Sequence, residues 1–163
     1  IGTGTALDTA RLKTALARHF QISPRNVHGL VLGEHGDSEF IAWSAAIIGG
    51  VPIKNIQGFD QKTAETIASR VRNEAYEIIN RTGATHFGIA QTVADIIAAI
   101  LYNQHKIIPV SAPLNNWNGV SGVCLGVPAV IGRTGIEKLW PLELTKTEKT
   151  QLQKSADKIK RYL

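Results

Sequence analysis

The pattern of apolar and polar residues predicts four helices. Apolar side chains recur every three or four residues in two stretches, 7–20 and 63–79, as on one face of an amphipathic helix. A third helix is expected over residues 87–104. The fourth begins where Thr145 and Glu148 have the spacing of a capping box. Its predicted apolar stripe consists of Leu152, Ala156, Ile159 and Leu163.

Runs of branched apolar residues predict the strands. Four such runs are residues 27–32, 107–112, 120–125 and 127–131. Residues 41–48 suggest a further strand that turns at Gly49 and Gly50 and returns over 51–53, although residues 43–47 also fit a helix. Strands and helices are therefore mixed without strict alternation. The expected fold class is α+β, with mixed antiparallel strands and long helices.

The composition describes a single globular domain. Of the 163 residues, 44% are hydrophobic and 19% are charged, and a chain of this length buries about two-thirds of the surface that its unfolded form exposes. The net charge is +5, but lysine and arginine are dispersed along the chain. The densest basic run, 154–161, is interpreted as a solvated helix face, because it lacks the aromatic residues of a nucleic-acid-binding surface. We expect no nucleic-acid partner.

The sequence also argues against membrane, metal and disulfide chemistry. The longest apolar stretches, such as 42–48, are far shorter than the roughly 20 residues that span a bilayer. The single cysteine, Cys124, excludes an intramolecular disulfide and fits a reducing compartment, so a cytoplasmic location is expected. The five histidines lack ligand spacing with one another or with Cys124, so no metal is expected.

Three polar residues are candidates for chemistry. Asp8 and Arg11 are three residues apart in a predicted helix and therefore share a face. An ordinary surface pair of this kind contributes only a few tenths of a kcal/mol. His35 follows an apolar run in the loop 33–37, where a histidine can act as acid or base or can simply hydrogen-bond to the backbone. The residue pattern alone leaves both interpretations open.

Residues 2–5 resemble the start of a dinucleotide-binding fingerprint. The third glycine of that fingerprint would fall at position 7, where the chain has Leu7. Almost no chain precedes this segment to supply the strand from which a phosphate-binding loop emerges. This segment alone is therefore not expected to bind a dinucleotide.

Residues 2–11 (GTGTALDTAR) and 33–39 (GEHGDSE) resemble the two signature segments of bacterial L-lactate dehydrogenases, in the lactate/malate dehydrogenase family. The resemblance continues through residues 83–90, 128–133 and the final helix, and so covers essentially the whole chain. It implies that residues 1–163 are the catalytic, substrate-binding domain. It also implies NAD as cofactor, bound mainly by an N-terminal Rossmann domain that this sequence does not contain.

The same resemblance implies a role for each candidate. His35 would exchange a proton with the substrate oxygen, Asp8 would accept a hydrogen bond from its other ring nitrogen, and Arg11 would bind the substrate carboxylate. A neighbouring carboxylate suits His35 to this role, and the planar guanidinium of Arg11 can donate two parallel hydrogen bonds. Thr85 and Ile89 would line the pocket for a small 2-keto or 2-hydroxy acid.

The resemblance further suggests regulation and assembly. Some bacterial members are activated by fructose 1,6-bisphosphate through a histidine and an arginine, and the matching positions are His28 and Lys13. Lys13 departs from that pattern, because lysine lacks the bidentate geometry of arginine toward phosphate. The family commonly forms tetramers, so a homo-oligomer is expected.

Other functions remain open from the sequence. L-2-hydroxyisocaproate and malate dehydrogenases share the aspartate, arginine and histidine arrangement, and the residues that discriminate among these substrates lie mostly outside the chain. From another class, the chain could be a non-catalytic anion-binding or interaction domain that keeps only the fold. We expect these 163 residues alone to be inactive as a dehydrogenase, because they include no hydride source.

Overall fold

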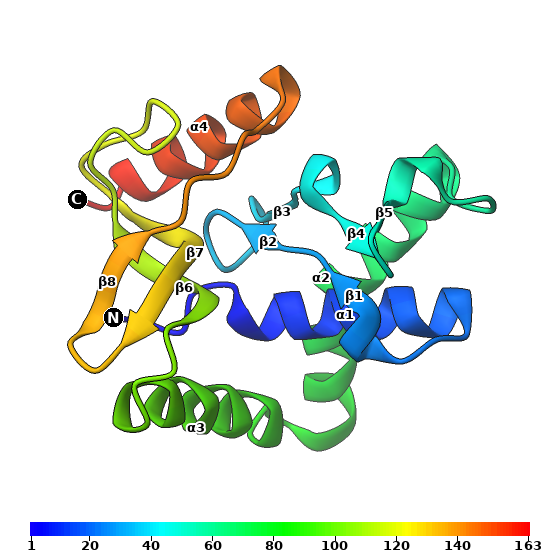
Figure 1. The fold of residues 1–163 in the computed structure, drawn as a ribbon, viewed down its shortest axis with the longest axis horizontal. Coiled ribbons are helices and arrows are strands. Elements are labelled where there is room, and N and C mark those ends of the chain that lie inside the picture. Colours follow the sequence, from blue (N-terminus) through cyan, green and yellow to red (C-terminus); the bar gives the residue numbers. More distant parts are fainter.

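The computed structural model describes all 163 residues as four helices packed around short antiparallel sheets (Figure 1). The helices are α1 (Ala6–Phe20), α2 (Gln61–Thr82), α3 (Phe87–Leu101) and α4 (Lys146–Lys160). In Figure 1, α1 runs through the middle of the molecule, with α4 on one side and α3 on the other. The predicted α+β class and the four predicted helices are confirmed.

The strands form three separate antiparallel groups. The largest sheet has the order β6-β7-β8, with β6 (Lys106–Pro113), β7 (Cys124–Gly132) and β8 (Gly135–Leu139). A second sheet has the order β1-β4-β5, with β1 (Val27–His28), β4 (Ile47–Ile48) and β5 (Val51–Pro52). The third group pairs β2 (Val31–Leu32) with β3 (Phe40–Ile41). Short 3-10 helices are Pro24–Asn26, Trp43–Ala45 and Ile53–Asn55.

Local capping explains where α2 begins and ends and where α4 begins. At the start of α2, the Asp60 side chain accepts a hydrogen bond from the Thr63 amide, and the helix ends at Gly83 with φ of 79°, a left-handed conformation that glycine adopts without strain. The predicted capping box of α4 is present, because Thr145 and Glu148 bond each other's backbone amides.

Two predicted strands are interrupted. The run 27–32 forms β1 and β2 rather than one strand, because β1 pairs with β4 whereas β2 pairs with β3. The change of partner occurs at Gly29, where a side chain would press on Leu12 of α1. The predicted strand 41–48 contains the 3-10 helix Trp43–Ala45, so the helical alternative was partly right.

Two further predictions were wrong in detail. The runs 120–125 and 127–131 do not form two strands, because one strand, β7, runs through Gly126 from Cys124 to Gly132. Leu163 does not continue the apolar stripe of α4: the helix ends at Lys160 and Leu163 is 87% exposed, whereas Leu152 and Ala156 are buried.

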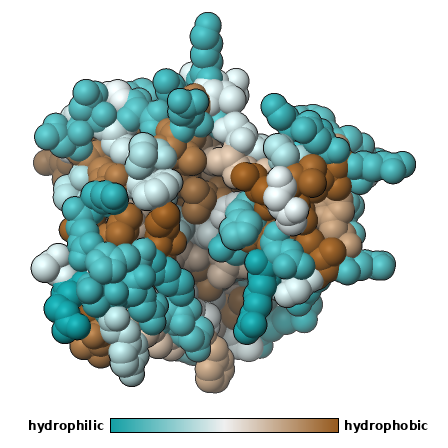
Figure 2. Space-filling view, viewed as in Figure 1, coloured by the Kyte–Doolittle hydropathy of each residue, from teal (hydrophilic) through white to brown (hydrophobic).

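Three apolar clusters hold the domain together. One joins α4 to β7 through residues such as Leu152 and Leu125, and another joins α1 to α2 through Leu16 and Val71. The third packs α3 on the large sheet. Polar residues dominate the face seen in Figure 2, and apolar atoms are visible mainly in patches and in the hollow along its middle. None of the four helices combines the length and the apolar content needed to cross a lipid bilayer.

Gly126 is required by a close approach of three chain segments. Its amide donates to the Gly33 carbonyl at 2.7 Å, and its carbonyl accepts from the Gly33 amide at 2.9 Å. A Cβ atom at position 126 would overlap the Thr5 side chain and would lie 3.0 Å from the Gly33 carbonyl oxygen. The absence of a side chain therefore lets the loop after β2 dock on β7.

We predict that Gly126→Ala lowers the free energy of unfolding by about 1–3 kcal/mol, the usual cost of overfilling a packed site. Urea unfolding followed by circular dichroism measures the change. Gly132→Ala, in the same strand, is the matched control, because the three atoms nearest the added Cβ belong to the carboxylate of Glu137, at the end of a flexible side chain. Equal losses in the two variants would contradict the account of Gly126.

Candidate functional site

A buried ion pair in the first turns of α1 forms the floor of the site. Asp8 is 2% exposed and Arg11 is also buried, one turn later on the same helix. The Nη1 group of Arg11 donates a hydrogen bond to Oδ1 of Asp8 at 2.8 Å. The two residues share a helix face, as their spacing predicts, but they are buried rather than on the surface.

His35 completes the group from the loop between β2 and β3. Its Nδ1 lies 2.7 Å from Oδ2 of Asp8, the carboxylate oxygen that Arg11 does not use. The His35 side chain is 58% exposed, and its Nε2 makes no hydrogen bond within the chain. The structure therefore brings together Asp8, Arg11 and His35, with the carboxylate buried and the imidazole partly open.

Two threonines, one just before α1 and one in its first turns, hold β2 beside the helix. Thr5 donates its hydroxyl hydrogen to the Val31 carbonyl at 2.6 Å, and the Val31 amide donates to the Thr9 hydroxyl at 2.9 Å. These bonds fix β2 beside the first turns of α1. His35, which lies three residues after the end of β2, is thereby held over Asp8.

The start of the loop that carries His35 is tied to α4. The Glu34 amide donates to the Ser155 hydroxyl at 2.6 Å, and the Glu34 carboxylate pairs with Lys158 at 3.0 Å. The hydrogen bonds and charge of Ser38 and Lys158 outweigh the effect of burial and lower the pKa of Glu34. The chain before His35 is thus anchored twice, at Val31 by α1 and its N-terminal edge and at Glu34 by α4.

The charges around His35 favour its protonated form. The hydrogen bond to Asp8 is the largest cause, and with a second contribution from Glu39 it raises the pKa of His35 from 6.5 to about 10. Burial raises the pKa of Asp8, but the hydrogen bond and charge of His35, together with Arg11, outweigh it and hold that pKa below its ordinary value. At neutral pH the site therefore contains an imidazolium, a guanidinium and a carboxylate.

Sequence reasoning did not single out Glu39, which lies at the same site. Its side chain is buried, and its Oε2 lies 3.9 Å from Nδ1 of His35. Burial and the charge of Asp8 raise the pKa of Glu39. An acidic residue directly before the apolar run 40–43 was the available signal in the sequence.

Asp8, His35 and Glu39 also have ligand atoms within 4.8 Å of one another, as in a metal site. The 2.7 Å separation of Asp8 and His35 is a hydrogen-bond distance. Two ligands of one zinc ion, each about 2.0–2.2 Å from the metal, lie farther apart than this. The geometry thus fits a shared proton better than a metal ion.

No hydrogen bond joins Thr85 or Ile89 to the three charged residues. Thr85 is half-buried between α2 and α3, and Ile89 is half-buried in the first turn of α3. A Cβ atom at Gly88 would lie 3.1 Å from Leu7. This turn of α3 therefore packs beside the residue that precedes Asp8.

No hydrogen bond joins the two candidate effector residues, and they do not line a common cavity. Lys13 is half-buried on α1 and lines a cavity with Lys106 and Asp95, and burial together with the charge of Lys106 lowers its pKa. His28 is exposed on β1 and does not line that cavity.

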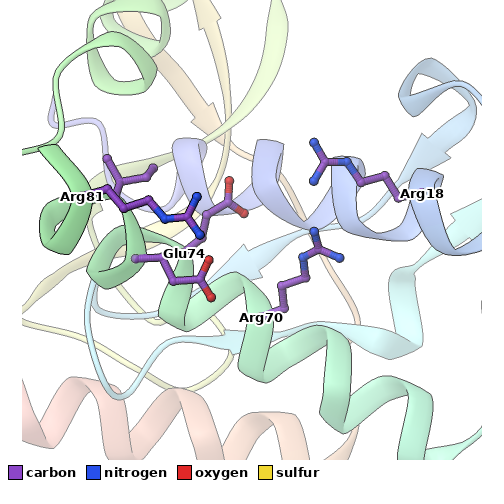
Figure 3. Close-up of a pocket in the computed structure, with 6 residues that line it drawn as sticks. Arg18, Arg70, Glu74 and Arg81 are labelled. Carbon is purple, nitrogen blue, oxygen red and sulfur yellow. The ribbon is translucent and has the colours of Figure 1, made fainter.

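Two further cavities are not lined by the three predicted charged residues. Figure 3 shows one of about 190 Å³ between α1 and α2, where Arg18 and Arg70 extend toward each other and Arg81 lies near Glu74. The other, of about 540 Å³, separates α2 from α4 and has Glu39 in its wall. Neither cavity is lined by Asp8, Arg11 or His35.

Comparisons with known proteins identify the class of domain. The chain belongs to the lactate/malate dehydrogenase family, because residues 5–163 match the profile of the lactate/malate dehydrogenase alpha/beta C-terminal domain. Among curated proteins it is similar to L-lactate dehydrogenase 1 of Listeria monocytogenes, with 44% identity over the whole chain and 52% of that protein. It is likewise 46% identical to the L-lactate dehydrogenase of Bacillus caldolyticus, of which it covers 53%.

Solved structures show the same relationship. The minor L-lactate dehydrogenase of Enterococcus mundtii superposes with a TM-score of 0.95 at 39% identity, over 99% of this chain and 52% of that one. A lactate dehydrogenase from a deep-sea metagenome library superposes with a TM-score of 0.93 at 41% identity, over 99% and 53% of the two chains. The chain therefore spans about half the length of the relatives it matches.

The raised pKa of His35 predicts a pH-dependent contribution to stability. Protonated His35 is stabilised in the folded state, so its contribution is fully present below the ordinary pKa of 6.5 and is lost as pH rises through about 10. The stability advantage of the wild type over His35→Asn should therefore decline between these two values. Urea unfolding of both proteins at a series of pH values measures it, and a constant difference would contradict the assignment.

Proposed function

We propose that the chain is the substrate-binding, catalytic half of an NAD-dependent L-lactate dehydrogenase that interconverts pyruvate and L-lactate. The observation that carries the proposal is that one buried carboxylate, Asp8, contacts both an imidazole and a guanidinium, at 2.7 and 2.8 Å. This arrangement provides a proton donor and an anion-binding group in one place. The names of the relatives support lactate as the hydroxy acid.

The proton-donor role follows from how His35 is held. Asp8 accepts the hydrogen bond of Nδ1, which fixes the ring orientation and leaves Nε2 as the outward donor. A pKa of about 10 keeps His35 protonated at neutral pH, so that Nε2 can donate to the keto oxygen of pyruvate. In the reverse direction, neutral His35 would accept the hydroxyl proton of lactate.

Arg11 supplies the charge that the substrate carboxylate requires. Nη1 is committed to Asp8, and the guanidinium has further N–H groups in the same plane. Because Arg11 is buried, a carboxylate bound to it is weakly screened by water. Binding the carboxylate at a fixed position also orients the keto carbon relative to His35.

The proposal does not place NAD on the first residues of the chain. Residues 2–7 lack the third glycine of the dinucleotide fingerprint, because position 7 is Leu7. We therefore assign the nicotinamide cofactor, which supplies the hydride, to an N-terminal Rossmann domain outside these 163 residues. Thr85 and Ile89 are assigned to the wall of the substrate pocket.

Two surface features bear on the proposed assembly and regulation. Helix α3 exposes an apolar stripe of Val93, Ile97 and Leu101, which favours association with another protein surface and fits a homo-oligomer. For fructose 1,6-bisphosphate, Lys13 beside Lys106 offers two positive charges. His28 does not line the cavity with these two lysines, so it would have to contact the bound effector from a neighbouring surface.

The alternative functions differ in what they require of the triad Asp8, Arg11 and His35 and of the pocket around it. Malate and hydroxyisocaproate dehydrogenases would use the same triad with different pockets, and rates with pyruvate, oxaloacetate and 2-ketoisocaproate discriminate among them. A binding-only domain would need positive charge but not a matched proton donor. The hydrogen bond between His35 and buried Asp8 favours an enzyme.

We predict that the purified chain alone does not oxidise NADH in the presence of pyruvate. Activity should appear when the chain replaces the matching half of the Listeria L-lactate dehydrogenase 1 in a chimera, because both halves then surround the cofactor. The decrease in NADH absorbance measures the activity of the chain alone and of the chimera. A folded chimera without activity would contradict the proposed function.

In that chimera, Arg11→Lys should lower kcat/KM for pyruvate by roughly 10- to 100-fold. Loss of a charge-assisted hydrogen bond costs about 1.5–3 kcal/mol, and each ~1.4 kcal/mol is a tenfold change in rate. Arg18→Lys, on the exposed face of the same helix, is the control and should leave kcat/KM unchanged. A binding-only domain would make the two variants indistinguishable.

A further inference from the structure

Glu39 is a second carboxylate beside the same imidazole nitrogen. The loop after His35 turns back through a hydrogen bond from the Glu39 amide to the Gly36 carbonyl at 3.1 Å. As a result, Oε2 of Glu39 lies 3.9 Å from Nδ1 of His35, while Oδ2 of Asp8 lies 2.7 Å from that same atom. Both carboxylates are buried, at 8% and 2% exposure.

The charges of the neighbouring elements leave Glu39 dependent on His35. On α1, Asp8 is already paired with Arg11 at 2.8 Å, so this ion pair offers Glu39 no free positive charge. On α2, Arg72 attracts Glu39 but forms no ion pair with it, and its side chain is exposed. His35 is therefore the cation closest to Glu39.

We propose that Glu39 is a positioning residue that stabilises the protonated form of His35 together with Asp8. Asp8 fixes the ring through a hydrogen bond, whereas Glu39 acts mainly through its charge. A buried carboxylate is costly unless it has an opposite charge nearby, so Glu39 and the imidazolium stabilise each other. The inference deepens the proposed function, because it concerns the group assigned there as proton donor.

The first test measures the titration of His35 in the unmodified chain and in Glu39→Gln. Long-range proton–nitrogen NMR spectra follow the ring, with the His35 signal assigned by its loss in His35→Asn. The midpoint of His35 should fall by about one pH unit in Glu39→Gln, because an opposite charge at this distance shifts a titration by that order. It should stay above the ordinary value, because Asp8 remains.

Two variants serve as controls. Asp37→Asn removes an equal charge from the same loop, but Asp37 is 79% exposed and its charged partner is Lys158, at 3.8 Å. It should leave the His35 midpoint unchanged. Glu39→Asp keeps the charge and should hold the midpoint closer to that of the wild type than Glu39→Gln does. An unchanged midpoint in folded Glu39→Gln would overturn the proposal.

A second measurement does not depend on a folded variant. In the unmodified chain, carbon-13 NMR of the Glu39 carboxyl should show a midpoint above the ordinary glutamate value, and the His35 ring signals should shift in the same pH interval. The proposal is equally overturned if the His35 signals do not respond while Glu39 titrates.

The pH dependence of the chimera separates this proposal from the proposed function. With Glu39→Gln, the alkaline fall of kcat/KM for pyruvate should move to lower pH, in parallel with the His35 midpoint. A shift of the midpoint without a shift of the rate profile would support the Glu39–His35 pairing and argue against His35 as the proton donor.

Discussion

The site depends on one constraint, which is that the carboxylate of Asp8 is buried away from water. Asp8 is 2% exposed, and an ionised group at such a position costs several kcal/mol unless opposite charges and hydrogen bonds offset it. Arg11 offsets part of this cost from the same helix, through one oxygen. The other oxygen requires a partner from outside α1, and His35 is the group that reaches it. The position of the loop after β2 is therefore determined by charge as well as by packing.

The surrounding fold satisfies that requirement through backbone contacts. Thr5 and Thr9 bind the backbone of Val31 from α1 and its N-terminal edge, and Gly126 on β7 binds Gly33 through both of its backbone groups. A loop secured on two sides loses little further entropy when its histidine binds a carboxylate or a substrate. Through these contacts, small buried residues in α1 and β7 help to position a histidine to which they are not bonded.

The sequence predicted the features that depend on near neighbours. The spacing of apolar residues and the caps at Asp60 and Thr145 are local, and the four helices were found. The division of 27–32 into two strands depends on partners in β3 and β4, and periodicity contains no record of those partners. The continuous β7 was missed for a related reason, because Gly126 reflects contact with Gly33 rather than a turn.

Less of the candidate site than of the helices could be predicted from residue spacing alone. Helical spacing placed Asp8 and Arg11 on one face, but only the resemblance to a family connected them with His35, which is 27 residues away from Asp8. The sequence marks Glu39 only as an acidic residue before an apolar run, and the contribution proposed for it depends on burial and on a backbone turn at Gly36. Long-range electrostatics is therefore the part that required coordinates.

The unequal burial of the site indicates how a covering domain would act on it. His35 is 58% exposed, and its pKa of about 10 belongs to an imidazolium that water still reaches. In the proposed enzyme, a nucleotide-binding domain and the substrate would cover this ring and remove that water. Desolvation disfavours the charged form of histidine, so the pKa would fall toward neutrality, where proton transfer in both directions is easiest. The negative charges of Asp8 and Glu39 stabilise the imidazolium and so offset this loss of hydration. Without them, His35 would lose its proton before the substrate binds.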